Sequence, residues 1–201
     1  MIRAADSSWC VAAVGLRVQS DGVEIDTLAE VAALLQQRNQ IDASIARMVQ
    51  RPMTAGHLGE WIASRVFDIE LEVSATAAAI DGRFRSGSLA GQTVNVKWYL
   101  KREGILDMSV SDKLDNYLVL AGPTSAAMTS RGGTRPWQID AVYLFDAKNL
   151  LAETVGRGVK VGVATSVRNP QWRAAEIYPE QINPRLMVGP SQVERLGLFR
   201  A

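Results

Sequence analysis

Several residue types that build familiar kinds of site are scarce in this 201-residue chain. Cys10 is the only cysteine, which excludes an internal disulfide and indicates a reducing compartment. His57 is the only histidine, so zinc sites built from several histidines or cysteines are excluded. The net charge is only +1, so the protein has no overall basic field to attract nucleic acid. No run approaches the roughly 20 apolar residues that a membrane-spanning helix needs.

The rest of the composition is that of an ordinary globular protein, with 47% hydrophobic and 21% charged residues. Nothing near the N-terminus is typical of a signal peptide, so we expect a cytoplasmic protein. We predict one globular domain overall. Its expected parts are a leader or edge segment (1–24), an N-terminal helical segment (25–52), a core (53–170) and a C-terminal wrapping tail (171–201).

Capping residues and apolar spacing predict helices before the core. Thr27 and Glu30 have the spacing of a capping box, and a second helical pattern runs from Ile41 to Val49. Thr54 is expected to cap a further helix that ends at Phe67. Later patterns predict a helix at 147–155 and strands at 69–79, 81–85, 92–100, 117–120, 137–145 and 159–167.

The strand at 92–100 has two chemically different faces, because successive side chains of a strand alternate. Val94, Val96 and Trp98 share one face and are expected in the core, whereas Asn95, Lys97 and Tyr99 share the other. If Asp81 opens the neighbouring strand, its carboxylate lies beside Asn95 and Lys97. An acid, an amide oxygen and a lysine on one face suit a hard cation and a phosphodiester. A turn acid beside a solvated strand face is the alternative interpretation.

These residues carry a resemblance to a known family. Asp81, followed after a hairpin-length gap by Asn95-Val96-Lys97, resembles the signature of the PD-(D/E)XK nuclease superfamily, and Glu60 matches the acid of its first core helix. The segments 38–42, 56–60 and 81–84 are similar to uncharacterised bacterial proteins assigned to that superfamily. The resemblance covers roughly residues 34–167. Ile80 stands where the family has proline, and Asn95 stands where it has a second acid.

The resemblance implies both a fold and a reaction. It implies a mixed α/β, restriction-endonuclease-like fold, in which helices flank a central mixed sheet behind an N-terminal helical segment. It also implies Mg²⁺-dependent (or Mn²⁺-dependent) phosphodiester hydrolysis with one or two ions, with Lys97, Asp81 and Glu60 as catalytic residues. Asp81, Glu60 and Asn95 would hold the metal. The substrate would be nucleic acid, with DNA favoured over RNA, and a homodimer is left open.

Further residues are candidates for contact with nucleic acid. A basic, glycine-containing loop runs from Ser130 to Pro136, and guanidinium groups bind phosphates well. The candidates are Arg131, Arg135, Arg83, Arg85, Tyr99 and His57. Each has a plainer alternative: a solvated loop or hairpin end for the arginines, packing for Tyr99, and a local hydrogen bond at a helix start for His57.

A non-catalytic binding protein is the alternative function. It is either a degenerate nuclease that binds nucleic acid without cutting it, or a helix-turn-helix protein. In the second case residues 45–52 and the helix capped by Thr54 form the motif, with Gly56 in or near the turn. His57, Trp61 and Arg65 would then face DNA, and Glu60 would be incidental.

Overall fold

The structure, a computed structural model, describes residues 27–72, 79–124 and 136–200. The chain divides into two units, Met1–Gln40 and Ile41–Ala201, and the boundary lies within the first helix. The described residues form a mixed α and β structure, which confirms the predicted fold class. Among them, no helix is both long and apolar enough to span a membrane.

The two helical patterns at the start of the described chain form one helix, α1 (Thr27–Val49). Its apolar residues do not form a buried face: Leu28, Val31 and Leu34 are each more than half exposed, and only Val49 at the end of the helix is buried. Pro52 follows three residues later, beyond the end of the helix, where proline is tolerated.

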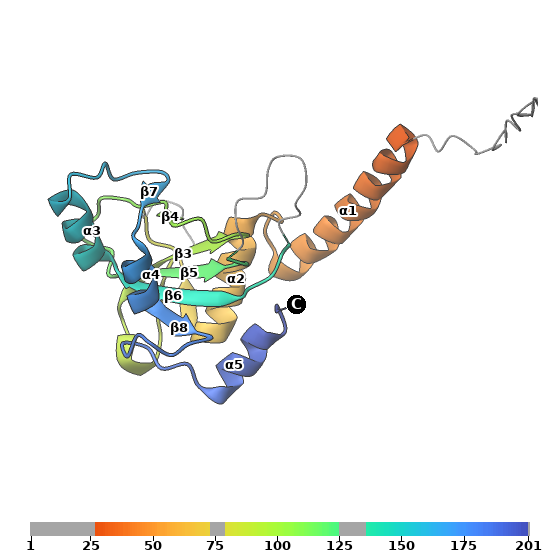
Figure 1. Cartoon of the computed structure of the whole chain (residues 1–201). Helices are drawn as coiled ribbons and strands as arrows, with labels where there is room; N and C mark the ends of the chain where they lie inside the picture. The colour runs from red at the N-terminus through yellow and green to blue at the C-terminus, as the bar shows by residue number, and fades with distance from the viewer. Residues whose placement is uncertain (1–26, 73–78, 125–135, 201) are drawn as a thin grey trace, which may run out of the picture. The chain divides into compact units, whose positions relative to one another are not determined.

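A six-stranded sheet occupies the centre of the Ile41–Ala201 unit in the described part of the chain (Figure 1). The strand order is β1 (Ile69–Leu71), β2 (Gly82–Phe84), β3 (Thr93–Tyr99), β5 (Asn116–Ala121), β6 (Ala141–Asp146) and β8 (Glu176–Tyr178). The pair β3 and β5 is parallel, and the other neighbours are antiparallel. β4 (Ile105–Leu106) and β7 (Thr165–Ser166) form a separate two-stranded sheet, and η1 (Gly87–Leu89) is a short 3₁₀ turn.

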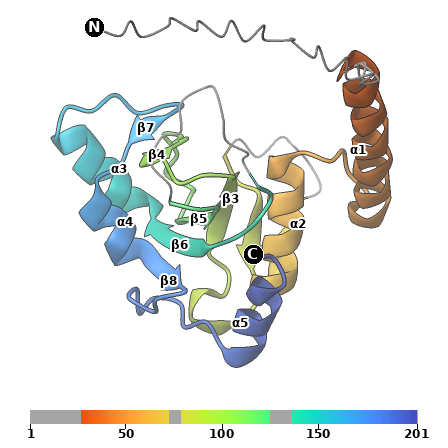
Figure 2. The same cartoon turned by 45° about the vertical axis from the view of Figure 1, so that its right-hand side comes forward.

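Helices cover both faces of the main sheet (Figures 1 and 2). The core on one face joins α2 (Ala55–Phe67) and α5 (Pro190–Gly197) to the sheet, and includes Val94, Val96 and Trp98 of β3. The core on the other face packs α3 (Ala147–Gly156) and α4 (Asn169–Ala175) against the sheet. All six residues of β5 are buried, as the continuous apolar run at 117–120 predicted for a central strand covered on both faces.

Two segments differ from the expected elements. Within 159–167 the strand is limited to Thr165–Ser166, paired with β4. The proline-rich tail at 171–201 is part of the core, because it supplies the edge strand β8 and the helix α5. Ile177, Tyr178 and Leu196 of this segment are each at most 5% exposed. Burial of those apolar side chains, rather than a local pattern, holds the tail against the sheet.

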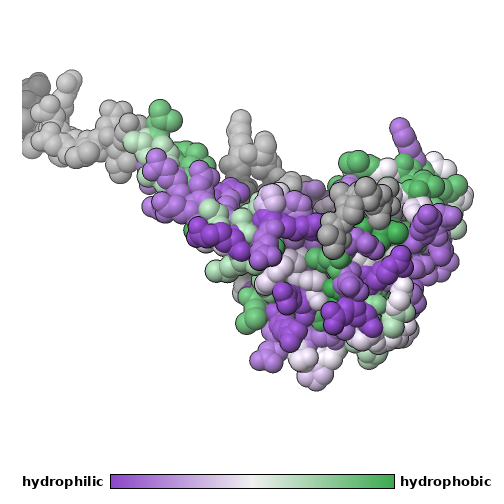
Figure 3. Space-filling model, turned by 180° about the vertical axis from the view of Figure 1, so that it is seen from behind, coloured by the Kyte–Doolittle hydropathy of each residue, from purple (hydrophilic) through white to green (hydrophobic). Residues whose placement is uncertain are grey.

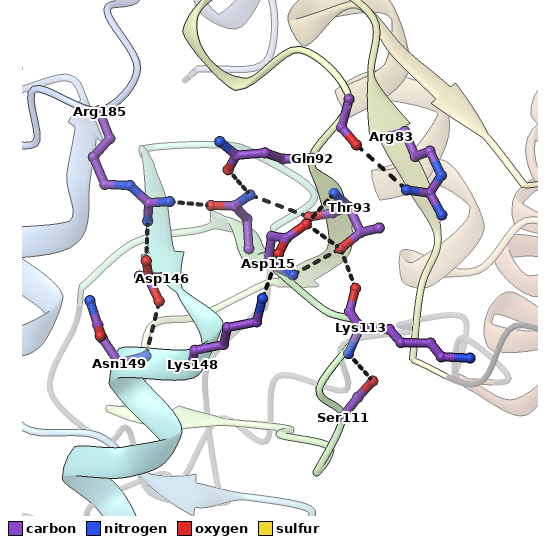
Figure 4. Close-up of polar contacts among 12 residues, drawn as sticks. Arg83, Gln92, Thr93, Ser111, Lys113, Asp115, Asp146, Lys148, Asn149 and Arg185 are labelled. Carbon is purple, nitrogen blue, oxygen red and sulfur yellow. Dashed lines mark hydrogen bonds and ion pairs between the residues drawn. The ribbon is translucent and has the colours of Figure 1, made fainter.

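A polar network fixes the beginning of β3 against its neighbours (Figure 4). The Thr93 hydroxyl donates to the Lys113 carbonyl (2.7 Å) and accepts from the Asp115 backbone N–H (2.8 Å). The Asp115 carboxylate accepts from the Thr93 backbone N–H and from Lys148 (both 3.0 Å). Burial alone would raise the pKa of Asp115, but these hydrogen bonds and the lysine charge hold it below its ordinary value. The network therefore anchors the strand that carries Asn95 and Lys97.

Candidate functional site

Glu60 owes its position to a close contact between α2 and β3. Thr54 caps α2 as predicted, since its side chain accepts from the His57 backbone N–H (3.2 Å). A Cβ on Gly59 would lie 2.9 Å from the Cβ of Trp98, so glycine is what permits this approach. The Glu60 side chain follows directly and is only 16% exposed.

Asp81 lies just before β2, where its backbone joins two neighbouring segments. Its N–H donates to the Val94 carbonyl, and its carbonyl accepts from the Glu72 N–H (both 2.9 Å). A Cβ on Gly82 would come within 2.4 Å of the Glu70 carbonyl oxygen, so the next position also requires glycine. The Asp81 carboxylate itself accepts from the Val96 N–H at 2.7 Å. The carboxylate is thereby held against β3.

The pKa of Asp81 shows which charges act on this carboxylate. Burial raises the pKa above its ordinary value, because it disfavours the charged form, and the negative charge of Glu60 raises it further. The hydrogen bond from Val96 and the positive charges of Lys97 and Arg51 act in the opposite direction. Glu60, Asp81 and Lys97 therefore lie within electrostatic reach of one another.

Arg51 is a member of this cluster that the sequence analysis missed. Its guanidinium forms an ion pair and hydrogen bond with the Glu60 carboxylate. The two residues are nine positions apart: Arg51 lies in the connection between α1 and α2, and Glu60 lies within α2. No helical or strand periodicity relates residues at that spacing, so no local signal could have joined them.

Asn95 is buried beside Asp81, with 5% of its surface exposed. Its side-chain N–H donates to the Ala79 carbonyl at 3.1 Å. Its side-chain oxygen is buried and has no hydrogen-bond partner among the described residues. Such buried, unsatisfied acceptors are uncommon and call for an explanation. A ligand that accepts lone-pair donation, such as a hard cation, would supply one.

The cluster contains side chains with suitable chemistry to bind a divalent cation, although Glu60 already forms an ion pair with Arg51. Glu60, Asp81 and Asn95 offer two carboxylates and an amide oxygen, which are the donors that Mg²⁺ and Mn²⁺ prefer. Within the described ranges, no three His, Cys, Asp or Glu side chains cluster closely enough to hold a metal. A cation bound here would depend on the amide oxygen of Asn95, and it would compete with Arg51 for Glu60.

His57 and Tyr99 have local partners. A ring nitrogen of His57 (Nδ1) lies 3.0 Å from the Pro52 carbonyl, to which it can only donate. The Tyr99 hydroxyl accepts from the Asp107 N–H at 2.8 Å, and burial raises the pKa of that hydroxyl. Both contacts match the plainer alternatives, in which these residues serve the local structure.

The arginines of the hairpin pair with nearby acids. Arg83 lies 3.8 Å from a Glu72 oxygen, and Arg85 lies 3.3 Å from an oxygen of Asp68. Both arginine side chains are more than half exposed, so contact with a polyanion would exchange one partner for another. Arg131 and Arg135, the other basic candidates, lie outside the described residues.

The helix that a helix-turn-helix motif would require, α2, packs against the main sheet and is part of the hydrophobic core. Ile62, Ala63, Val66 and Phe67 of α2 are buried against the sheet. Trp61 is partly buried beside them, and the Arg65 guanidinium lies 5.6 Å from the centroid of a Trp61 ring. Two of the three side chains expected to face DNA therefore contact each other.

Comparison with known proteins adds no relative to these observations. The chain matches no protein-family model, and no curated protein gives a significant match. The case for a function therefore depends on the cluster of Arg51, Glu60, Asp81, Asn95 and Lys97.

Proposed function

We propose that this protein is a metal-dependent nucleic-acid phosphodiesterase of the restriction-endonuclease-like kind. The single observation that carries the proposal is the environment of Asp81. Its carboxylate is partly buried, held against β3 by the Val96 N–H, and subject to the charges of Glu60 and Lys97. Carboxylates with raised pKa values and a specific charged partner are concentrated at functional sites.

Each residue of the cluster has a distinct role in this proposal. Asp81 and Glu60 would hold Mg²⁺ or Mn²⁺, and Asn95 would add its unsatisfied oxygen. The ion would supply a polarised phosphoryl group and a more acidic water. Lys97 would orient the attacking water or stabilise the negative charge that develops on the phosphoryl oxygens. Among the described residues its amine makes no hydrogen bond or ion pair, so it is available to a substrate phosphate.

The proposed substrate is nucleic acid, with DNA favoured over RNA. Arg83 and Arg85 are exposed and could exchange their carboxylate partners for phosphates. The single cysteine fits a reducing cytoplasm, where we place the activity. Hydrophilic and hydrophobic residues are mixed on the face seen in Figure 3. The net charge of the chain is only +1, so local arginines rather than a broad basic surface would make the contacts.

A non-catalytic binding protein on the same fold is the second candidate, and the Arg51–Glu60 ion pair favours it. The guanidinium already neutralises one of the two carboxylates that a metal would need. A site that has lost its second acid and gained an internal cation would still present Lys97 and the hairpin arginines to a nucleic acid.

Metal titration and a cleavage assay distinguish the two candidates. If the protein is an enzyme, the full chain binds Mn²⁺ in calorimetry and nicks a plasmid. Asp81→Ala abolishes metal binding and cleavage, and Lys97→Ala keeps metal binding but loses cleavage. Asn95→Asp strengthens metal binding and cleavage, because it adds a charge to the ligands. Glu70→Ala, at an exposed position of β1, is the matched control and should change neither.

The result against catalysis is equally clear. If the wild type and Asn95→Asp neither bind Mn²⁺ nor cut DNA or RNA, the enzyme proposal is wrong. Salt-dependent binding of DNA under the same conditions would then favour the binding protein.

A further inference from the structure

A cavity lies between β6 and α4, and Asp81 is not part of its lining. Its volume is about 670 Å³, within the range of small-molecule sites. Tyr143 and Trp172 contribute aromatic surface to its lining, Arg102 and Arg173 contribute cations, and Glu176 and Glu180 contribute carboxylates. All of these residues belong to the Ile41–Ala201 unit. The cavity is therefore lined both by aromatic side chains and by charged side chains that can form hydrogen bonds.

Trp172, which lines this cavity, carries a buried donor. The residue is 1% exposed, and its indole N–H has no hydrogen-bond partner among the described residues. The ring is held firmly, because Tyr143 and Phe145 contact it edge-on with centroids 4.9 and 5.0 Å away. Buried indole N–H groups usually find an acceptor. An acceptor atom of a ligand would satisfy this one.

The charged residues of the cavity offer donors and acceptors side by side. The Arg102 guanidinium lies 5.9 Å from the centroid of a Trp172 ring, and its Nε donates to the Thr124 hydroxyl at 3.2 Å. Glu176 accepts from the Glu180 N–H at 3.3 Å. Burial raises the pKa of Glu176, and the nearby Glu180 charge adds to that rise. A ligand that presents both acceptors and donors along one edge would engage both kinds of group.

The cavity lies on the same face of the sheet as Lys97. In the register of the strands Lys97 is opposite Val119, and Val119 is opposite Tyr143. Residues directly opposite one another on neighbouring strands point to the same face. Two strand spacings separate Lys97 from Tyr143, which is about 10 Å. Val119, which lies between them, is fully buried in the core, so a nucleic-acid strand with a phosphate at Lys97 would have to pass around that core to place a base in the cavity.

We propose that this cavity binds a guanine base of a nucleic-acid strand. Guanine presents two acceptors, O6 and N7, that match an arginine fork, and its N1–H and N2–H groups are donors to a carboxylate. Arg102 and Glu176 are the residues assigned to these two edges, and the Trp172 N–H supplies a further donor. Adenine has an amino donor where guanine has O6, so it leaves the arginine without that acceptor. The position of the base beside a phosphate rests on the proposed function, whereas recognition of guanine does not.

Binding of mononucleotides tests the recognition directly. We expect the full chain to bind dGMP at least tenfold more tightly than dAMP in calorimetry. Arg102→Ala and Glu176→Gln should each weaken dGMP binding about tenfold. Glu194→Gln, at an exposed position of α5, should not change it. Trp172→Phe keeps an aromatic ring but removes the N–H, so it should weaken binding several-fold.

A spectroscopic signal distinguishes binding in this cavity from binding elsewhere. In protein labelled with 5-fluorotryptophan, the resonance that Trp172→Phe removes should shift on addition of dGMP. Equal affinity for dGMP and dAMP, no detectable binding of either, or a Trp172 resonance that does not move would each overturn the proposal.

Two further measurements distinguish a failure of the guanine site from a failure of the proposed function. Binding of dGMP by a protein that neither binds Mn²⁺ nor cuts nucleic acid would leave the guanine site standing while contradicting the proposed function. A short single-stranded DNA with one guanine should bind at least tenfold more tightly than dGMP, because the strand also reaches Lys97. If it binds no more tightly, the site takes free guanine nucleotides, and the assignment to a nucleic-acid strand is wrong.

Discussion

Arg51→Met is the most informative single change at the candidate site, because it removes the cation that neutralises Glu60. The Arg51 side chain is 38% exposed and that of Glu60 is 16% exposed, so the pair is neither fully solvated nor fully buried. Exposed ion pairs contribute about 0.2–1 kcal/mol, whereas breaking a buried pair costs about 3–5 kcal/mol. Because the arginine is more than a third exposed, solvent screens the pair, and we take about 1 kcal/mol for the coupling that a metal must overcome.

That coupling sets the expected change in metal affinity. Since 1.4 kcal/mol is a tenfold change in affinity, removing the competitor should lower the Kd for Mn²⁺ about fivefold. Loss of Arg51 also removes a positive charge that lowers the pKa of Asp81, so that pKa rises further. Mn²⁺ requires the ionised carboxylate, and its binding should therefore begin at a higher pH in the variant than in the wild type.

Calorimetric titration of the full chain with Mn²⁺ measures both effects, and thermal unfolding provides an independent measurement. Without metal, Arg51→Met should unfold at a lower temperature, because Glu60 is left partly buried without its partner. Saturating Mn²⁺ should restore the Tm. Arg47→Met is the matched control, since the Arg47 guanidinium bonds Ser44 on its own helix. An unchanged Kd in Arg51→Met, or an equal change in Arg47→Met, refutes the competition.

Three other substitutions and one control test the framework around the site. Gly59→Ala should lower the free energy of unfolding, because overpacking costs about 1–3 kcal/mol and helix propensity returns only about 1 kcal/mol. Gly56→Ala, whose Cβ would make only an ordinary van der Waals contact with Thr54, is the control and should be stabilising by chemical denaturation. Asp81→Asn should raise the Tm at neutral pH, because the pKa of Asp81 is raised in the folded protein and ionisation of this carboxyl therefore destabilises the fold as pH rises through that pKa. The gain should vanish below about pH 3.8, where the side chains of wild type and variant are both neutral. Thr93→Val should cost about 1–3 kcal/mol in urea unfolding, because the Asp115 N–H loses its acceptor.

Local patterns were sufficient for the elements that carry the candidate residues. Alternation placed Val94, Val96 and Trp98 in the core, and a capping residue located the start of α2 at Thr54. These features depend on spacings of two to four residues, which a sequence displays directly. The same reasoning located α1, but apolar spacing defines a face of a helix and not what covers it, and that face is largely exposed.

The sequence by itself therefore determined a mixed α and β fold and the strand that presents Asn95 and Lys97 on one face. Only the tertiary structure decided that Arg51 pairs with Glu60 and that the Asn95 oxygen is buried without a partner. Only the tertiary structure also brought Arg102 and Trp172, 70 positions apart in the sequence, to the same cavity. The physical reason is that ion pairing, desolvation and cavity shape depend on distances between segments remote in the chain. Those distances follow from strand order, register and the packing of helices on the sheet, and no short-range pattern of residues encodes them.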